Sequence, residues 1–336
     1  MKTTIKSRKN KKLYSTVIKL TVIVYICLSV VLSGFGVVYY LNNSTEPMHG
    51  EIIPDERIPL AMISTFDIPI PYAPGINIKE NNFARIDYSN ANDGYVKVKF
   101  HYNIYNRIIA TKETPNNGFY FFNIMPLSYQ VIPLTKGDGA YTVTIFKYYD
   151  GLGFSPMVQA NLGVVLDNYF SPFLTPNQFV NYNKYSEVVS VARQLTANAK
   201  SELDKIAAVF DYITTNISYD FELADNVLNN NVVGYIPDLD SVLERQKGIC
   251  FDYAALMTAM LRSQGIPTRM VFGQAGDTYH AWVDVFSTER GWINDVIFFE
   301  GNEWQRIDPT LKALHENQRI AKFIGDGINY IPELYY

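Results

Sequence analysis

Cysteine is scarce in this chain of 336 residues and occurs only as Cys27 and Cys250. Cys27 lies in an apolar run near the N-terminus, so Cys250 has no disulfide partner in the body that follows. The four histidines, at positions 49, 101, 280 and 315, do not stand at zinc-ligand spacing from either cysteine. These absences exclude a disulfide scaffold and a structural zinc site, and we expect neither a metal nor another cofactor.

Charged residues are few, at 18% of the chain, and they are unevenly placed. Segment 1–19 holds seven basic residues and no acidic one. Without those seven, 22 of the 29 basic residues remain against 33 acidic residues, so the rest carries a formal charge of −11. A body this acidic is unsuited to binding nucleic acid, and we expect no such partner.

One long uncharged run indicates where in the cell the protein is located. Residues 20–41 form 22 consecutive positions without a charged side chain, which is the length that a helix needs to cross a bilayer. The basic segment before this run would stay in the cytoplasm, which places everything after residue 41 outside. We therefore expect a membrane anchor with an extracytoplasmic body. The alternative is a secreted protein with a cleaved signal peptide, although no small-x-small cleavage site follows the run.

Strand patterns dominate the next part of the chain. After a polar, proline-containing linker at 42–60, residues 61–168 show alternating runs such as Tyr95–Tyr102 and Ala140–Phe146. Turn sequences rich in Asn, Asp and Gly separate these runs. The pattern predicts an all-β domain, an immunoglobulin-like sandwich. His101 falls on the polar face of its run, and we expect it to be a surface residue without a catalytic role.

Helical periodicity replaces the strand pattern further on. Residues 180–325 are predicted to form an α+β domain in which helices precede strands. One helix is expected from Ser186 to about Leu195, and Ser201 begins another with the pattern of a capping box. Asp240 is expected to be the N-cap of a third helix. Residues 326–336 are assigned to a C-terminal tail.

Cys250 begins a run of strong helix formers, which Gly265 terminates and Pro267 follows. This order places the thiol in the first turn of a buried helix, where free backbone N–H groups and the helix dipole favour a thiolate. The same N–H groups would stabilise an oxyanion formed by attack on a carbonyl. Gly248 is expected to leave space for a substrate beside the sulfur. These features predict a nucleophile and not a small buried apolar residue.

His280 stands at the start of an alternating run, residues 280–286, that predicts a strand. An imidazole in this position can accept the thiol proton and later protonate a leaving amine. It needs an acceptor to orient it, and two aspartates are candidates. Asp308 ends a short predicted strand before Pro309, whereas Asp295 is closer in sequence. Spacing alone does not choose between them.

Four motifs together resemble the core of the transglutaminase-like superfamily, over roughly residues 185–320. They are Gly248-x-Cys250, Leu261-Arg262-x-x-Gly265-Ile266-Pro267-x-Arg269, His280-Ala281-Trp282 and Trp304-x-x-x-Asp308-Pro309-Thr310. The resemblance implies a papain-like fold with a Cys-His-Asp triad, in a bacterial-type, membrane-anchored member. It makes Cys250 the nucleophile, His280 the general acid and base, and Asp308 the group that fixes the imidazole tautomer. Residues 296–303 lengthen the usual gap between histidine and aspartate, which keeps Asp295 as an alternative.

Three further residues are candidates for the cleft. Tyr219 lies where relatives place a cleft tyrosine, although simple packing explains it equally well. Gln246, four residues before the cysteine, is a candidate oxyanion donor by loose analogy with papain. Trp282 is a candidate for substrate binding. No acidic loop matches the calcium sites of the eukaryotic members, so none is expected.

The family implies two classes of function. Its active members transfer an acyl group from an amide through a thioester to an amine or to water. We therefore expect crosslinking, deamidation or hydrolysis of amides in a protein or cell-wall peptide at the bacterial cell surface. The alternative is a non-catalytic surface protein, in which the sandwich binds a ligand and the transglutaminase-like fold is a scaffold. The presence of all three triad residues favours the enzyme.

Overall fold

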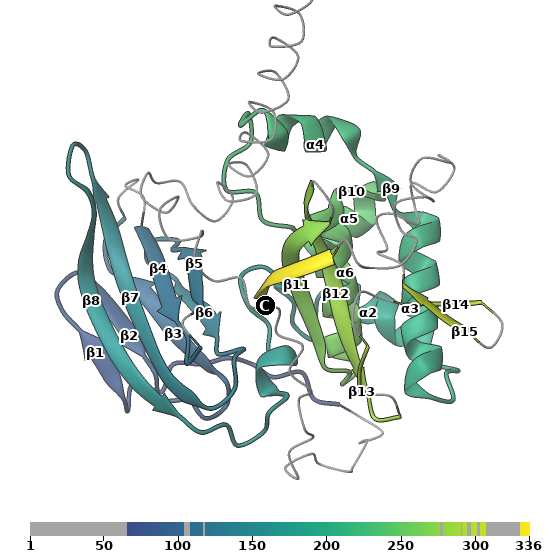
Figure 1. The fold of residues 1–336 in the computed structure, drawn as a ribbon, viewed down its shortest axis with the longest axis horizontal. Helices are drawn as coiled ribbons and strands as arrows, with labels where there is room; N and C mark the ends of the chain where they lie inside the picture. The colour runs from purple at the N-terminus through teal and green to yellow at the C-terminus, as the bar shows by residue number, and fades with distance from the viewer. Residues whose placement is uncertain are drawn as a thin grey trace, which may run out of the picture.

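The computed structural model describes residues 66–103, 108–116, 118–275, 278–289, 291–293, 297–300, 303–306 and 330–336. An all-β part and a mixed α/β part lie side by side in it (Figure 1). The segments predicted as basic, transmembrane and linker lie outside the described residues. Among the helices that are described, none has the length and apolar character needed to span a membrane.

Two four-stranded antiparallel sheets make up the all-β part, as the alternating runs predict. One sheet has the order β1-β2-β3-β6, formed by Ile78–Glu80, Ala84–Asp87, Tyr95–Phe100 and Tyr129–Pro133. The other has the order β5-β4-β7-β8, formed by Phe119–Asn123, Ile108–Glu113, Gly139–Tyr149 and Gly153–Val164. Apart from β1, this pairing corresponds to strands A-B-E and C′-C-F-G of an immunoglobulin-type sandwich.

Alternation along β3 shows how these sheets acquire an inner and an outer face. Val96 and Val98 are fully buried, whereas Lys97 and Lys99 point outward over the Tyr129 ring. Burying apolar side chains from both sheets is the main source of stability in such a sandwich. The apolar positions of the alternating sequence are therefore the ones whose side chains form the core of the sandwich.

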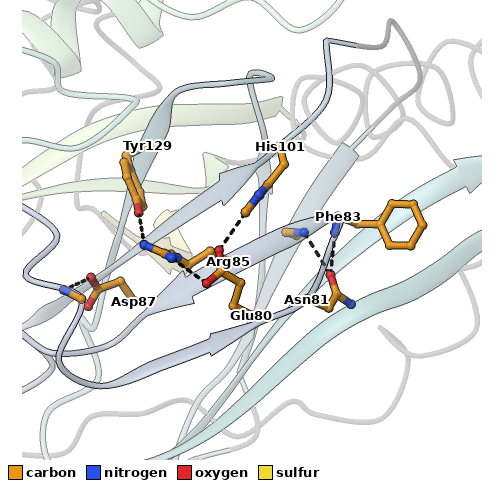
Figure 2. Close-up of polar contacts among 9 residues, drawn as sticks. Glu80, Asn81, Phe83, Arg85, Asp87, His101 and Tyr129 are labelled. Atoms are coloured by element: carbon orange, nitrogen blue, oxygen red, sulfur yellow. Dashed lines mark hydrogen bonds and ion pairs between the residues drawn. The ribbon is translucent and has the colours of Figure 1, made fainter.

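His101 lies on the outer face of this sheet, as expected of a surface residue. Its Nε2 is 3.4 Å from Oε1 of Glu80, whose other oxygen accepts a hydrogen bond from Arg85 at 2.5 Å (Figure 2). Tyr129 completes the row, with its hydroxyl 3.4 Å from Nη1 of Arg85. These half-exposed contacts belong to the sheet surface and lie in a different part of the fold from Cys250.

Helices come first in the α/β part, as predicted. After a short 3-10 turn, η1 at Ser171–Phe173, the helices are α2 (Glu187–Thr196), α3 (Glu202–Asn216), α4 (Phe221–Leu228), α5 (Leu239–Arg245) and α6 (Cys250–Ser263). The short strands β9 (Ser218–Tyr219) and β10 (Lys247–Gly248) pair in parallel between them. Strands β11 (Thr268–Ala275), β12 (Thr278–Ser287), β13 (Gly291–Ile293), β14 (Ile297–Glu300), β15 (Glu303–Arg306) and β16 (Tyr330–Tyr335) follow.

The predicted helix starts are confirmed with one correction. The Ser201 hydroxyl oxygen accepts a hydrogen bond from the Asp204 N–H at 3.0 Å, which caps α3 as the sequence indicates. The N-cap of α5, however, is Asp238 and not Asp240. Asp240 lies inside the first turn, and its carboxylate accepts a hydrogen bond from the Val188 N–H at the start of α2. The carboxylate chosen as a cap therefore joins two helices.

The assignment of residues 326–336 to a tail is wrong for their described part. Strand β16 pairs with β11 and completes a four-stranded sheet of order β13-β12-β11-β16. Tyr336 beyond it is fully buried, with its ring against Phe122 of the sandwich and Phe272 of β11. The strand was missed because the segment is short and contains Pro332, and because its pairing partner β11 is more than fifty residues earlier.

Arg262 ties this strand to the rest of the domain from the last turn of α6. Its fully buried guanidinium donates to three carbonyl oxygens, those of Thr268 at 2.8 Å, Thr175 at 3.0 Å and Tyr336 at 2.7 Å. Desolvation lowers the pKa of Arg262 to about 10, which still leaves it charged at neutral pH. One side chain thus joins α6, β11, the connector after the sandwich and the end of β16.

Replacing this side chain should destabilise the whole α/β part. In Arg262→Met the three carbonyl oxygens stay buried without a donor, and we expect the free energy of unfolding to fall by roughly 3 kcal/mol or more. Urea denaturation followed by fluorescence measures the loss. Arg193→Met, at an exposed position of α2, is the matched control and should change stability by less than about 0.5 kcal/mol. Equal midpoints for the two variants would contradict the role given to Arg262.

Candidate active site

Cys250 is the first residue of α6, as the sequence predicts. Its N-cap, Ile249, has an extended backbone with φ −98° and ψ 178°. The thiol is partly exposed, while every later residue of the helix is buried. The N-terminal turn of a helix presents unpaired N–H groups and a positive dipole end. Cys250 is therefore a partly exposed residue at the electropositive start of an otherwise buried helix.

The backbone just before Cys250 is held from two sides. The Asp220 N–H donates to the Gly248 carbonyl at 2.9 Å, which continues the parallel pairing of β9 and β10. The Ile249 N–H donates to Oδ2 of Asp252 at 2.7 Å. Ile249 has no side-chain acceptor, so this is the carboxylate half of a capping box. The turn that carries the nucleophile is consequently fixed by a side chain two residues after it.

Gly248 has a packing role that was not expected, while the space for a substrate stays a prediction. A Cβ at this position would lie 2.5 Å from Cβ of Asp252 and 3.0 Å from its Oδ2. Contacts this short are not tolerated between packed atoms. The glycine makes room for the Asp252 side chain beneath the turn.

Asp252 also binds a residue from the loop between α4 and α5. The Tyr235 hydroxyl donates to Oδ1 of Asp252 at 2.6 Å. The Asp252 side chain is fully buried, and this desolvation raises its pKa to about 6, although both hydrogen bonds and Arg245 act in the opposite direction. Within the described part of the chain Asp252 forms no salt bridge, so no cation compensates its buried charge at contact distance.

Contacts at both ends align α6 with strand β11. Near the first residue, the ring centroids of Phe251 and Phe272 are 5.0 Å apart. Near the last, Arg262 donates to the carbonyl of Thr268. The helix therefore runs antiparallel to β11, with the Cys250 end at the level of Phe272.

The register of β11 and β12 extends this placement to His280. Phe272 pairs with Ala281, and Gly273 pairs with His280. His280 is the third residue of β12, close to the start of the strand as predicted. The end of α6 that carries Cys250 therefore lies level with His280 along the sheet.

Alternation divides this part of β12 between two faces. His280 and Trp282 share one face, while Ala281 lies on the other, in the core that also contains α6 residues. A Cβ at Gly273 would collide with the carbonyl oxygen of Ile331 and with the Trp282 ring. Trp282 is buried, with 1% exposure, which favours packing over the predicted contact with substrate.

The remaining predicted residues are placed as follows. Gln246 ends α5 in the left-handed conformation, with φ 52°, and its side chain is exposed. Tyr219 pairs with Gly248 in the parallel ladder, and its ring lies 5.0 Å from that of Phe221. Their roles as oxyanion donor and cleft residue stay predictions. Both aspartate candidates, Asp308 and Asp295, lie outside the described residues.

The part of the chain that carries these residues matches a known family. Residues 189–309 match the model of the transglutaminase-like superfamily, so this segment is a transglutaminase-like domain. The uncharacterized protein YebA of Bacillus subtilis is 28% identical over 124 residues, which cover 32% of this chain and 16% of the relative. A protein-glutamine gamma-glutamyltransferase of Pseudomonas aeruginosa is 26% identical over 110 residues, which cover 28% and 15%. The chain thus spans a small fraction of either relative.

Solved structures show weaker similarity. A candidate cysteine protease from Cytophaga hutchinsonii is 13% identical with a TM-score of 0.36, covering 78% of this chain and 74% of that one. A structure described as a TGase is 22% identical with a TM-score of 0.27, covering 49% and 46%. At these scores the overall arrangements are not closely alike.

Some features of the site were not predicted. Helix α4 was missed, although Asp220 caps it by accepting from the Leu223 N–H at 3.0 Å. The Asp252–Tyr235 contact was missed because the two residues are separated by a helix. An acidic residue at the third position of α6 was a usable signal for the Asp252 half. Among the described residues no group of three His, Cys, Asp or Glu side chains is placed to hold a metal.

The raised pKa of Asp252 predicts that the free energy of unfolding decreases as pH rises. Because the folded pKa of about 6 exceeds the model-peptide value of 3.8, its stabilising effect is present below 3.8 and is lost as pH rises through 6. The side chain in Asp252→Asn does not titrate. Between pH 4 and pH 7 the wild type should therefore lose on the order of 3 kcal/mol in its free energy of unfolding relative to this variant. Urea denaturation at a series of pH values measures the difference.

The exposed carboxyl of Asp225 on α4 provides the control for this measurement. Asp225→Asn should follow the wild type within about 0.5 kcal/mol across the same pH range. If Asp252→Asn also runs parallel to the wild type, burial does not raise the pKa of this carboxyl.

Proposed function

We propose that this chain is a thiol-dependent acyl-transfer enzyme acting on amides, with Cys250 as nucleophile, His280 as general acid and base, and Asp308 as the residue that orients the imidazole. The observation that carries the proposal is the position of Cys250. It is the partly exposed first residue of a buried helix whose start lies level with His280, within a transglutaminase-like domain.

The reaction follows from the chemistry of these groups. The Cys250 sulfur, having given its proton to His280, attacks the amide carbonyl carbon and forms a carbon–sulfur bond. The carbon–nitrogen bond then breaks, and the leaving amine takes the proton from the imidazolium, which leaves a thioester. An amine or water attacks the thioester, its proton passes to His280 and then to sulfur, and the thiol is restored. In this mechanism the N–H groups of the first helical turn stabilise the oxyanion of both tetrahedral intermediates.

The acceptor decides whether the product is a crosslink or a hydrolysed amide. One sequence relative is named for the first kind of product, a protein-glutamine gamma-glutamyltransferase. Both reactions begin with the same thioester, so the substrate class is an amide in a protein or peptide. The exposed Phe221 ring beside Tyr219 provides an apolar surface near the Cys250 turn for such a chain.

The proposed place of action is outside the membrane. Support comes from the uncharged run at 20–41 and the basic segment before it. In that location Cys250 lacks a second cysteine in the body with which to form a disulfide, which suits a thiol that must stay reduced.

Alkylation of the thiol tests the proposal. Iodoacetamide should modify Cys250 in residues 42–336 at neutral pH at least about tenfold faster than it modifies a free cysteine peptide, because the helix start favours the thiolate. His280→Ala should remove most of this advantage. Mass spectrometry of quenched samples gives the rate constants, and Cys250→Ala shows that the label sits on this residue.

The wild type and its variants then separate the reaction classes. Incubation with a glutaminyl peptide and a primary amine yields either amine incorporation or ammonia release, and Cys250→Ala abolishes both. His101→Ala, on the outer face of the sandwich, should leave every rate unchanged. A thiol that reacts no faster than the free peptide, and is indifferent to His280→Ala, would show that the domain is a non-catalytic scaffold.

A further inference from the structure

The most constrained polar side chain near Cys250 has no part in the reaction just described. Asp252 is fully buried, and both of its carboxylate oxygens accept hydrogen bonds, from the Ile249 N–H at 2.7 Å and the Tyr235 hydroxyl at 2.6 Å. A residue without a Cβ at position 248 accommodates it. Three separate features of the chain therefore converge on one carboxylate beneath the nucleophile.

We propose that Asp252 is a positioning residue for Cys250, and that Tyr235 acts on Cys250 through Asp252. The proposal rests on the proposed function for the meaning of Cys250, but its geometry is independent of that function. Ile249 is the residue immediately before the cysteine, so the direction of its N–H fixes the Gly248–Ile249 peptide plane, from which the backbone continues directly to Cys250. Asp252 holds that N–H, and Tyr235 holds Asp252.

A neutral amide would fill the same space at less desolvation cost, so the effect of the charge can be separated from the effect of the contacts. Burial disfavours the ionised carboxyl, and the charged groups that act on it are Arg245 on α5, which lowers its pKa, and Asp220 at the start of α4, which raises it. Cys250, two residues earlier, is the titratable group next to it on this helix, whereas His280 lies level with this end of α6 on the β12 face opposite Ala281. A carboxylate here opposes a thiolate. Its charge state therefore adjusts the balance between thiol and thiolate.

Tyr235 connects this balance to a loop. It lies between α4 and α5, in a segment that runs beside the sandwich, since a Cβ at Gly234 would be 3.8 Å from Nδ2 of Asn123 on β5. Its ring also packs against Phe251, with centroids 6.3 Å apart. A substrate that displaces this loop would weaken the Tyr235–Asp252 hydrogen bond and change the reactivity of the thiol.

A double-mutant cycle tests the proposal through the pH dependence of Cys250 alkylation by iodoacetamide between pH 5 and pH 9. In Asp252→Asn the amide can accept from Ile249 and donate to Tyr235, so the variant removes charge while keeping the contacts. The midpoint should fall by roughly one pH unit, because a like charge near the thiolate is gone. Tyr235→Phe should shift the midpoint in the same direction by a smaller amount, because loss of the hydroxyl favours the protonated carboxyl.

The cycle is completed by the double variant. If Tyr235 acts through Asp252, adding Tyr235→Phe to Asp252→Asn moves the midpoint no further. Tyr182→Phe is the matched control, because its buried hydroxyl donates to the Leu174 carbonyl at 2.9 Å. It should cost similar stability and leave the midpoint where it is in the wild type.

Two outcomes would overturn the inference. One is a Tyr235→Phe shift of equal size in both backgrounds, and the other is a midpoint in Asp252→Asn that equals that of Tyr182→Phe. Circular dichroism identifies any variant that fails to fold, and the Asp252→Asn comparison stands alone if Tyr235→Phe does so. Every thiol has an alkylation midpoint, so the cycle can be read even if slow, His280-independent alkylation refutes the proposed function.

Discussion

The fixed position of α6 is the constraint on which the rest of this structure depends. Arg262 anchors one end through three carbonyl oxygens, and Asp252 holds the turn at the other end. Between them the helix is buried by α2, α3 and the sheet. A helix is a rigid spacer, so fixing both ends fixes the partly exposed first residue. The catalytic proposal for Cys250 requires that rigidity, because a nucleophile gains most when its approach to the carbonyl is preset.

The two anchors differ in kind. Arg262 is a cation whose hydrogen bonds all go to main-chain oxygens, so it acts as a structural tie between segments far apart in the sequence. Asp252 is an anion whose burial is only partly offset by its partners, so its protonation state responds to pH in an accessible range. The charge of Arg262 at one end of the helix is therefore constant around neutral pH, whereas the charge of Asp252 at the other end changes with pH. Asp252 lies at the end that carries the thiol.

Much of this arrangement was predictable from sequence, and the exceptions share a cause. Local signals placed α2, α3 and α6 because capping residues and periodicity depend on neighbours a few positions away. Alternation predicted the sandwich for the same reason. Strand β16 and the Asp252–Tyr235 bond were missed because each depends on contacts between residues distant in sequence. Asp240 was misread since a carboxylate near a helix start can cap its own helix or another one. The triad aspartate stays a sequence-based prediction.

Strand β16 imposes an order of events on the growing chain. Arg262 is made before one of its three acceptors, which belongs to Tyr336, more than seventy residues later. Until that residue docks, the guanidinium lacks one of its three acceptors and β11 is an uncovered edge of the sheet. The thiol helix is thus completed only after nearly all of the chain printed here has been made. Tyr336 also packs against Phe122, so the sandwich helps to close the sheet. The final positioning of Cys250 at the start of α6 is in this way linked to the assembly of both parts of the molecule.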